Sequence, residues 1–521
     1  MSIHLETDVL IIGGGMAAGW AAIAAAQGGA RVIVANKGYM GTSGVTATGG
    51  PNHWWVAPDP ARRDEAITRQ RSKAQGLGDP EWMARILDLT WRYLPSLAPH
   101  YPFGSDGAGG TYYSGVRGSE YMRALRLAAL EAGVTVFDHH PAIELLRDAE
   151  GRIAGARGHA LRARQDWEIR SHTTILATGG NAFRSGLIGS RTNTGDGQLM
   201  AAEAGVALSG MEFGPSWSIS PAWASTRTLP YTGAVYYDAE GQELDIPPPR
   251  AAGHAHHRAL SHAMLAGPVL ADLSHAPEAL RPILRRIQPF TPAPFERRGI
   301  DLFRDRFPVK LFGEGTIRGT GGLDLADAEC RTSAPGLFAI GDAATRELVA
   351  GANSGGGAVN SAWALSSGRI AGAAAARESL KRKGVSAPVQ GLGRVAIAPQ
   401  QGERAIDASA IHRAVDHEIH GYAHVFTREE ASYAASGARL EAIWRELANH
   451  GRASGAELVA LRETAALVAG ARWTIAAARA RRESRGLHQR ADYAEAAGPT
   501  HRQLVSGLDT IRLNAQQAEF A

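Results

Sequence analysis

The sequence predicts an α/β protein whose core is a parallel sheet covered by helices, and three observations support this fold class. Apolar stretches of strand length end in glycine-rich corners at Val9–Ile12, Thr174–Gly180 and Ala334–Ala344. An alanine-rich segment of helical length follows the first corner, and a long segment rich in small residues follows the last. Strands that are apolar along their whole length are typical of parallel sheets buried on both faces.

The first corner has the spacing of a dinucleotide-binding turn. Gly13, Gly15 and Ala18 occupy the three small positions of the pattern G-x-G-x-x-G/A, and a helix is predicted to begin at Met16. The first glycine allows a tight turn, the second lets the backbone approach a pyrophosphate, and the third small residue lets helix and strand pack closely. The first N–H groups of the helix, Ala17 included, then face the phosphates. A glycine-rich turn of some other α/β protein is the alternative.

The second predicted strand, Arg31–Ala35, departs from this pattern at its end. Asn36 and Lys37 stand where an acidic residue normally holds the ribose hydroxyls. An asparagine can still hydrogen-bond a hydroxyl, so a simple NAD interpretation is weakened while an adenine dinucleotide remains allowed. Far downstream, Asp342 follows a glycine at a strand end beside a second predicted helix N-terminus. We therefore expect the nucleotide site to be built from both ends of the chain.

Composition and charge argue against several classes of protein. The 521 residues, 44% of them apolar, are enough for two or three globular domains. The net charge is only +4 and the basic residues are scattered, so the sequence does not predict a basic surface that would bind nucleic acid. The single cysteine, Cys330, allows no internal disulfide and no iron–sulfur cluster, which normally needs four cysteines.

The sequence predicts neither a signal peptide nor a membrane span. The start MSIHLETD is too short and too polar for a signal peptide, and no apolar run reaches the roughly 18 residues of a membrane span. We therefore expect a cytoplasmic protein without a membrane span and without a nucleic-acid partner.

Seven motifs in a fixed order carry a resemblance to a known family. They are GGGMAAG, GTSGVTATGG, ATGG, TGDG, MEF, PGLFAIGDAA and GANSGGG, and they are followed by RRESRGLHQRADY at Arg481–Tyr493. Over nearly the whole chain they resemble the flavoprotein superfamily of succinate dehydrogenase, fumarate reductase, L-aspartate oxidase and the adenylylsulfate reductase alpha subunit.

The resemblance implies a discontinuous Rossmann-like FAD-binding domain, an inserted α+β capping domain and a helical C-terminal domain. On this chain the FAD-binding domain maps to residues 1–205 and 321–385, the cap to 206–320, and the helical domain to 402–521. A segment rich in proline, glycine and glutamine, Ser386–Gln401, is predicted to be a linker.

The resemblance also implies FAD as the cofactor and a set of residues that hold it. The implied cofactor-binding residues are Gly13, Gly15, Met16, Ala17, Ala18, Asn36, Lys37, Thr42, Ser43, Gly49, Gly50, Ala177, Thr178, Gly179, Asp196, Asp342, Ser354, Ala358 and Val359. In respiratory members a histidine in S-H-T-x-x-x-x-G-G bonds covalently to the flavin. Ser43 stands at that position here, so we expect non-covalent FAD with a lower potential.

The chemistry that the family implies is hydride exchange between a substrate carbon and flavin N5. The dicarboxylate members share a substrate cage that this chain lacks. Their E-F-x-x-x-H-P-T segment is MEFGPSWSISPAW here, the histidine of H-Y-T-x-G-G is Ile317, and the arginine of G-A-N-R is Ser354. A doubly charged substrate would find too few partners to replace its water. We therefore argue against succinate, fumarate and aspartate, and expect a larger, less charged substrate.

Two tryptophans near the lost cage, Trp217 and Trp223, leave two interpretations open. They could stack on an aromatic or heterocyclic substrate, or they could pack in the core of the cap.

Candidates for proton transfer lie in IPPPRAAGHAHHRALSHAM, where the family has P-R-D-x-x-x-R-A with a proton-shuttling arginine. Arg250 and Arg258 are the two candidate counterparts, and we favour Arg250 for its Pro-Arg context. The same stretch has four histidines: His254, His256, His257 and His262. His257 is a candidate acid or base, while a metal site and a solvated helix are the alternatives. We favour the solvated helix and predict no metal site.

Flavin is the only redox centre that the sequence suggests, so turnover needs a second electron partner. We expect an iron–sulfur or ferredoxin-like subunit, because YTGAVYYDAEG resembles the adenylylsulfate reductase alpha subunit. Reoxidation by oxygen, as in the aspartate oxidase branch, is one alternative. A non-catalytic electron-transfer or scaffold flavoprotein is another. The oligomeric state is left open.

Overall fold

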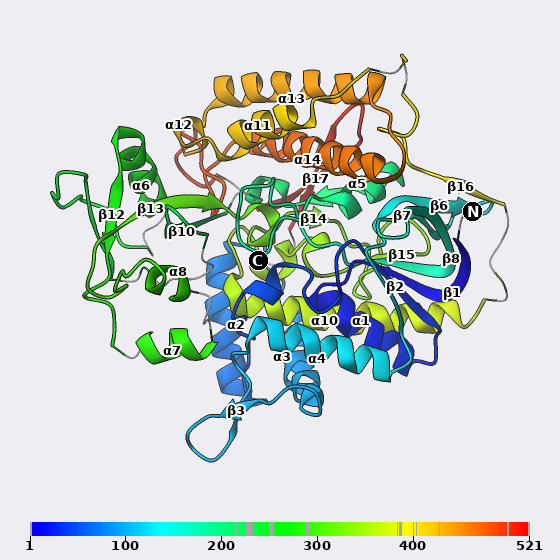
Figure 1. Cartoon of the computed structure of the whole chain (residues 1–521), viewed down its shortest axis with the longest axis horizontal. Coiled ribbons are helices and arrows are strands. Elements are labelled where there is room, and N and C mark those ends of the chain that lie inside the picture. Colours follow the sequence, from blue (N-terminus) through cyan, green and yellow to red (C-terminus); the bar gives the residue numbers. More distant parts are fainter. Residues whose placement is uncertain are drawn as a thin grey trace.

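The structure is a computed structural model of the chain (Figure 1). It describes residues 3–214, 216–225, 231, 233–249, 255–278, 280–287, 291–382, 384, 388–399, 401–402, 404–426, 428–497 and 500–518.

The main sheet has a parallel core. Its strands are β1 (Ile3–Ile12), β2 (Val32–Asn36), β5 (Thr135–Asp138), β8 (Gln165–Leu176) and β15 (Leu337–Ala339). They pair in the order β5-β2-β1-β8-β15, every pair parallel, with Val9 between Val32 and Thr173. β15 comes from far along the chain, which confirms that both ends of the sequence build this sheet.

An antiparallel extension continues the sheet beyond β8. It contains β7 (Ile153–Ala160), β6 (Ala142–Asp148) and β16 (Val389–Gly391), each antiparallel to its neighbour. β16 lies inside the segment predicted to be a linker. Three residues of that segment therefore form an edge strand, a pairing that its proline- and glycine-rich composition conceals.

Two helices cross each other closely over the parallel strands (Figure 1). They are α1 (Met16–Gln27) and α10 (Gly356–Ser379). A Cβ atom at Gly372 would lie 2.3 Å from the Ala21 carbonyl oxygen, so only glycine permits this approach. The small-residue composition of both helices thus serves packing. Further helices of this region are α2 (Pro60–Ala74), α3 (Pro80–Tyr93), α4 (Gly118–Glu131), α5 (Asp196–Glu203) and α9 (Glu347–Ala350).

The inserted cap forms one end of the molecule (green in Figure 1). Its sheet has the antiparallel order β10-β13-β12-β11, and its strands are β10 (Trp217–Pro221), β11 (Val235–Tyr237), β12 (Val269–Asp272) and β13 (Phe307–Gly313). Its helices are α6 (Ala255–Ala266), α7 (Leu280–Ile287) and α8 (Ala293–Glu296). A separate hydrophobic cluster fills it, which agrees with the predicted α+β cap.

The C-terminal region begins with helices, as predicted. They are α11 (Ala408–His420), α12 (Tyr422–Val425), α13 (Glu430–His450) and α14 (Gly455–Ala480). A hairpin that the sequence reading missed follows: β17 (His501–Ser506) and β18 (Arg512–Gln517). β17 also pairs with β9 (Leu208–Ser209), which pairs with β14 (Gly322–Leu323). The end of the chain is thereby attached to both junctions of the cap. Among the described residues no helix is long and apolar enough to cross a membrane.

Candidate active site

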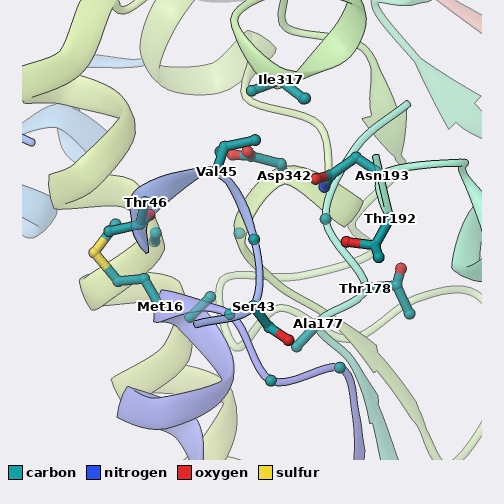
Figure 2. A pocket seen from close by; sticks show the side chains of 18 of the residues that line it. Met16, Ser43, Val45, Thr46, Ala177, Thr178, Thr192, Asn193, Ile317 and Asp342 are labelled. Atoms are coloured by element: carbon teal, nitrogen blue, oxygen red, sulfur yellow. The ribbon is translucent and has the colours of Figure 1, made fainter. Parts of the chain in front are cut away.

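A deep cavity lies where the parallel strands end and two helices begin (Figure 2). Its walls come from the carboxyl ends of β1, β2, β8 and β15, from the N-termini of α1 and α10, and from the loop 43–52. Ile317 and Arg318, which return from the cap, close one side. The site thus joins segments that lie more than 300 residues apart in the chain.

The glycine corner shapes the floor of this cavity. Gly13 has a φ of +110°, and a Cβ atom there would lie 2.3 Å from the Ala177 carbonyl oxygen. A Cβ atom at Gly15 would have no atom within 4 Å and would project into open space. The first glycine is therefore required by the fold, whereas the second keeps the cavity free for a ligand.

Both helix N-termini at the cavity suit an anion. The N-caps of α1 and α10, Gly15 and Gly355, make no side-chain capping bond, and neither helix has an acidic residue in its first turn. The first N–H groups and the positive end of each helix dipole are thus available to phosphate oxygens. The exception is the first N–H group of α10, because the Gly356 N–H donates to Ser354 Oγ at 3.1 Å.

Asn36 and Ser43, two predicted cofactor residues, contact each other. Asn36 Nδ2 donates a hydrogen bond to Ser43 Oγ at 2.8 Å, and Asn36 is buried. Asn36, which ends β2 in place of an acidic residue, is thus bonded to the serine expected at the position of the flavin-bonding histidine. The pair fixes the loop 43–52 against the end of β2.

Lys37 is the centre of a half-buried group of four charges. Its Nζ atom lies 2.5 Å from Asp196 Oδ2 and 2.8 Å from Glu463 Oε1, and it donates to Thr194 Oγ1 at 2.8 Å. Arg184 completes the group at 2.5 Å from the other oxygen of Glu463. Burial alone would lower the pKa of Lys37, but the two carboxylates outweigh it and raise that pKa. A charged lysine therefore lines the cavity, held in part by the C-terminal helix α14.

Asp342 is held from behind by Arg346. The Arg346 guanidinium is buried and donates to Asp342 Oδ1, and also to the carbonyl oxygens of Thr316 (2.6 Å), Ile317 (3.0 Å) and Gly319. Burial lowers its pKa. One side chain thus fixes both the carboxylate at the cavity and the loop that returns from the cap.

Several buried polar atoms at the cavity have no hydrogen-bond partner in the described structure. They are Thr178 Oγ1, Asn193 Oδ1, and Oδ1 and Nδ2 of Asn360. Such atoms are costly unless a ligand or water satisfies them. A ligand with phosphate, hydroxyl and ring nitrogen groups meets these requirements, so the residues present fit FAD.

Most of the predicted cofactor residues line this cavity. Those that do are Gly13, Gly15, Met16, Ala17, Asn36, Lys37, Ser43, Gly49, Gly50, Ala177, Thr178, Gly179, Asp196 and Asp342. Five do not. Ala18 is fully buried in the helix packing, Thr42 is exposed, and Ser354, Ala358 and Val359 lie beside lining residues rather than at the wall.

Sequence reasoning left other lining residues unnamed. They include Gly14, Gly44, Val45, Thr46, Thr192 and Asn193. These residues lie within the quoted motifs or beside them. Treating every residue of a motif as part of the cavity wall would therefore have identified them. Figure 2 shows Val45 and Thr46 on one side of the cavity and Thr192 and Asn193 on another.

The proposed proton-transfer residues do not line this cavity in the described structure. Arg250 and His254 lie outside the described residues. Arg258 and His257 stand on α6, and neither is at the cavity wall. His256 is buried, its Nδ1 atom lies 2.6 Å from the Pro247 carbonyl oxygen, and burial lowers its pKa. No group of three or more His, Cys, Asp or Glu side chains suited to a metal occurs in the described part of the chain.

Trp217 is buried and Trp223 is half-buried, and both pack against aromatic side chains. Trp217 contacts the rings of Phe426 and His420 at centroid distances of 5.1 and 5.5 Å. Trp223 contacts Phe295 at 5.5 Å, with the Arg298 guanidinium over its ring. Neither lines the large cavity, so these contacts support the packing interpretation.

A parallel sheet with two helix N-termini at one glycine-lined cavity, interrupted by a cap, defines a dinucleotide-binding α/β protein. The chain belongs to the FAD binding domain family, which matches residues 8–359, and the family described as fumarate reductase flavoprotein C-term matches residues 420–505. FAD is therefore its cofactor, and the resemblance seen in the motifs is confirmed.

Curated relatives include two named enzymes. One chain of the fumarate reductase (CoM/CoB) of Methanothermobacter marburgensis is 28% identical over 268 residues, which are 46% of this chain and 48% of that protein. The L-aspartate oxidase of Streptomyces coelicolor is 26% identical over 396 residues, 65% of this chain and 63% of that protein. The chain thus spans about half to two thirds of the length of these relatives.

Solved structures share the whole fold. The quinol fumarate reductase flavoprotein of E. coli superposes with a TM-score of 0.81 at 21% identity, covering 99% of this chain and 97% of that one. The adenylylsulfate reductase of Archaeoglobus fulgidus gives a TM-score of 0.75 at 18% identity, covering 100% and 97%. The predicted fold, with its inserted cap and C-terminal helices, is thereby confirmed, while the domain limits given above stay predictions.

Proposed function

We propose that the protein is an FAD-dependent oxidoreductase that exchanges hydride between flavin N5 and a small organic substrate other than a C4 dicarboxylate. The observation that carries this proposal is the large cavity. It combines the N-termini of two helices, a glycine floor and unpartnered buried polar atoms with a wall that returns from the cap. Bound FAD supplies the redox chemistry, and the protein supplies orientation and electrostatics.

The residues around the cavity divide the cofactor between them in this proposal. The corner at Gly13–Ala17 and the start of α10 bind the pyrophosphate through backbone N–H groups. Asp342 and Asn360 offer polar side chains to the sugar-like part of the cofactor. Lys37 and Asp196 lie at the end of the cavity formed by β2 and α5 and hold the adenosine half.

FAD is bound without a covalent link in this proposal. Ser43 stands at the position of the flavin-bonding histidine, and its hydroxyl accepts a hydrogen bond from Asn36. A serine hydroxyl offers no imidazole nitrogen for such a bond, so the cofactor is held by non-covalent contacts alone.

The substrate side of the cavity lacks the groups that a dicarboxylate needs. Ile317 is buried at the wall, and Ser354 is engaged by the Gly356 N–H. Arg318 is the cationic side chain at this side, and its Nε atom lies 3.2 Å from Glu314 Oε2, which offsets its charge. A substrate with an uncharged reacting end therefore fits better than one with two carboxylates.

The proton-transfer group and the electron partner remain proposals. Arg250 is the proposed proton-transfer residue because it follows a proline as in the family motif, and Arg258 and His257 are the alternatives. An iron–sulfur or ferredoxin-like protein is the proposed electron partner, and the shared fold of adenylylsulfate reductase is compatible with it. Reoxidation by oxygen and a non-catalytic electron-transfer role are the alternatives. The cytoplasmic location stays a prediction.

An absorbance spectrum of the purified protein, repeated on the supernatant after acid precipitation, tests the cofactor proposal. Flavin released into the supernatant supports non-covalent FAD, whereas flavin retained in the pellet would contradict the role given to Ser43. Anaerobic reduction of the flavin by uncharged and monoanionic candidates, with succinate as the comparison, then tests the substrate class. Reduction by succinate alone would refute it.

A further inference from the structure

The charged residues in the wall of the large cavity are Lys37, Asp196, Asp342 and Arg318, as far as the described residues go. Lys37 and Asp196 pair with each other near the end of β2, in the part proposed to hold the adenosine half. Asp342 pairs with Arg346 behind the wall. Arg318 is therefore the cation in the part of the wall that returns from the cap, away from the adenosine half.

Arg318 is held by a single carboxylate that leaves most of its donors available. Its Nε atom lies 3.2 Å from Glu314 Oε2, four residues earlier in the chain. The side chain of Arg318 is 23% exposed and that of Glu314 is 5% exposed. Within the described part of the chain the Arg318 guanidinium donates no hydrogen bond to another residue. A guanidinium carries several N–H donors, so a ligand in the cavity can engage those that face it.

The backbone on both sides of Arg318 is fixed. The buried Arg346 guanidinium donates to the carbonyl oxygens of Ile317, at 3.0 Å, and Gly319. A Cβ atom at Gly319 would lie 2.4 Å from the Gly214 carbonyl oxygen, so the loop is packed closely against its neighbour. The position of the Arg318 backbone is thus set before any ligand binds, which is the condition for effective electrostatic stabilisation.

The charge of Arg318 is felt inside the site. Burial lowers the pKa of Arg346, Asp342 opposes that effect, and the neighbouring charge of Arg318 adds to it. Two arginines, Arg318 and Arg346, are thus balanced by two carboxylates, Asp342 and Glu314. An additional negative charge on a ligand beside Arg318 would be stabilised by its guanidinium, because water screens such a charge poorly at a partly buried site.

We propose that Arg318 faces the flavin ring and raises the redox potential of bound FAD, and that Glu314 limits this effect. The inference rests on the proposed function, because it needs the ring at the end of the cavity away from Lys37. A ring that accepts a hydride gains two electrons and one proton, and therefore one negative charge. A fixed cation near the ring nitrogens stabilises that charge and favours the reduced cofactor.

The midpoint potential of the purified holoprotein, measured against reference dyes during anaerobic reduction, tests this role. Arg318→Gln should weaken the preference for the reduced cofactor about tenfold, which lowers the potential of a two-electron couple by about 30 mV. Arg318→Lys should lie between Arg318→Gln and the native protein, because it keeps the charge and loses the planar fork. Glu314→Gln should shift the potential in the opposite direction, since it removes the carboxylate that offsets Arg318.

Arg69→Gln is the matched control. Arg69 pairs with Glu65, again four residues earlier, but the pair stands on α2 with side chains 67% and 69% exposed and outside the cavity wall. This variant changes the net charge by the same amount and should leave the potential unchanged. An equal shift in Arg69→Gln would overturn the proposal, because the effect would then be one of net charge.

A second readout is the ionisation of the reduced flavin at N1, followed in absorbance spectra of the reduced protein against pH. It should move to higher pH in Arg318→Gln, because the cation that favours the anionic ring is lost. Unchanged potentials in both Arg318 variants, or a Glu314→Gln shift in the same direction as theirs, would overturn the proposal. Arg318→Lys and Glu314→Gln decide the question if Arg318→Gln does not retain FAD.

These measurements need no organic substrate. Their failure is therefore distinct from failure of the proposed function, which would show as purified protein without flavin or as a flavin that no organic substrate reduces.

Discussion

The charge group around Lys37 gives a prediction whose magnitude follows from the structure. Glu463→Gln removes one carboxylate from a group in which Lys37 and Arg184 balance Asp196 and Glu463. The side chains of Lys37, Asp196, Glu463 and Arg184 are 16%, 20%, 15% and 29% exposed. Breaking a fully buried pair costs about 3–5 kcal/mol, and an exposed pair contributes about 0–1 kcal/mol. We expect a loss of about 2 kcal/mol for this partly exposed group.

A double-mutant cycle in urea measures this loss. Lys37→Met combined with Glu463→Gln restores charge balance, because Arg184 and Asp196 remain. The double variant should therefore cost about 1–2 kcal/mol less than the sum of the single variants. Glu446→Gln on the neighbouring helix α13 is the control, since its carboxylate is half exposed and 3.9 Å from His450, and it should change stability by less than about 0.5 kcal/mol. Additive single effects would refute the claim that the four charges act as one group.

Three further predictions concern the cofactor, the cap and acid stability. Gly15→Val should abolish FAD binding, because its side chain would project into the open space of the cavity; flavin content per protein measures this, and a normal content would contradict the assigned site. Trp217→Ala should destabilise the protein by about 3–5 kcal/mol in urea unfolding while leaving flavin content unchanged, because the ring packs in the cap cluster; lost substrate reduction with unchanged stability would favour a stacking role instead. Burial would raise the pKa of Glu483, but hydrogen bonds from Arg485 and Arg481 outweigh it and lower that pKa to about 2. Its stabilisation is therefore present above the ordinary glutamate pKa and is lost as pH falls toward 2. Glu483→Gln should flatten the acid limb of stability against pH, and an unchanged acid limb would exclude this source.

The glycine corner could be predicted from sequence because its determinants are local. Strand, turn and helix follow one another within a few residues. The contact that excludes a Cβ atom at Gly13 comes from Ala177 on the next strand of the sheet, so the pattern indicates the glycine and the fold supplies the reason for it. The partner of Lys37 could not be predicted, because Glu463 is 426 residues away and stands on a helix that reads as an ordinary packing helix. The edge strand β16 was missed for a related reason. Its three residues are specified by the free edge of β6 and not by their own composition.

Helix α14 holds parts of the cofactor site together through ionic contacts at both of its ends. Glu463 reaches the charged lysine at the cavity, and Arg462, the residue before it, forms a bidentate pair with Glu203 of α5 at 2.7 and 2.6 Å. At the other end of the same helix, Arg481 is fully buried between Glu212 and Glu483, each 2.7 Å away. One helix therefore connects the end of the cavity at β2, the base of the cap at Glu212 and the C-terminal segment at Glu483. Because these contacts are ionic and largely shielded from water, displacing the helix would leave uncompensated charges at all three places. The C-terminal helices are thus a structural part of the cofactor site, even though they contribute none of the residues that line the large cavity in the described structure.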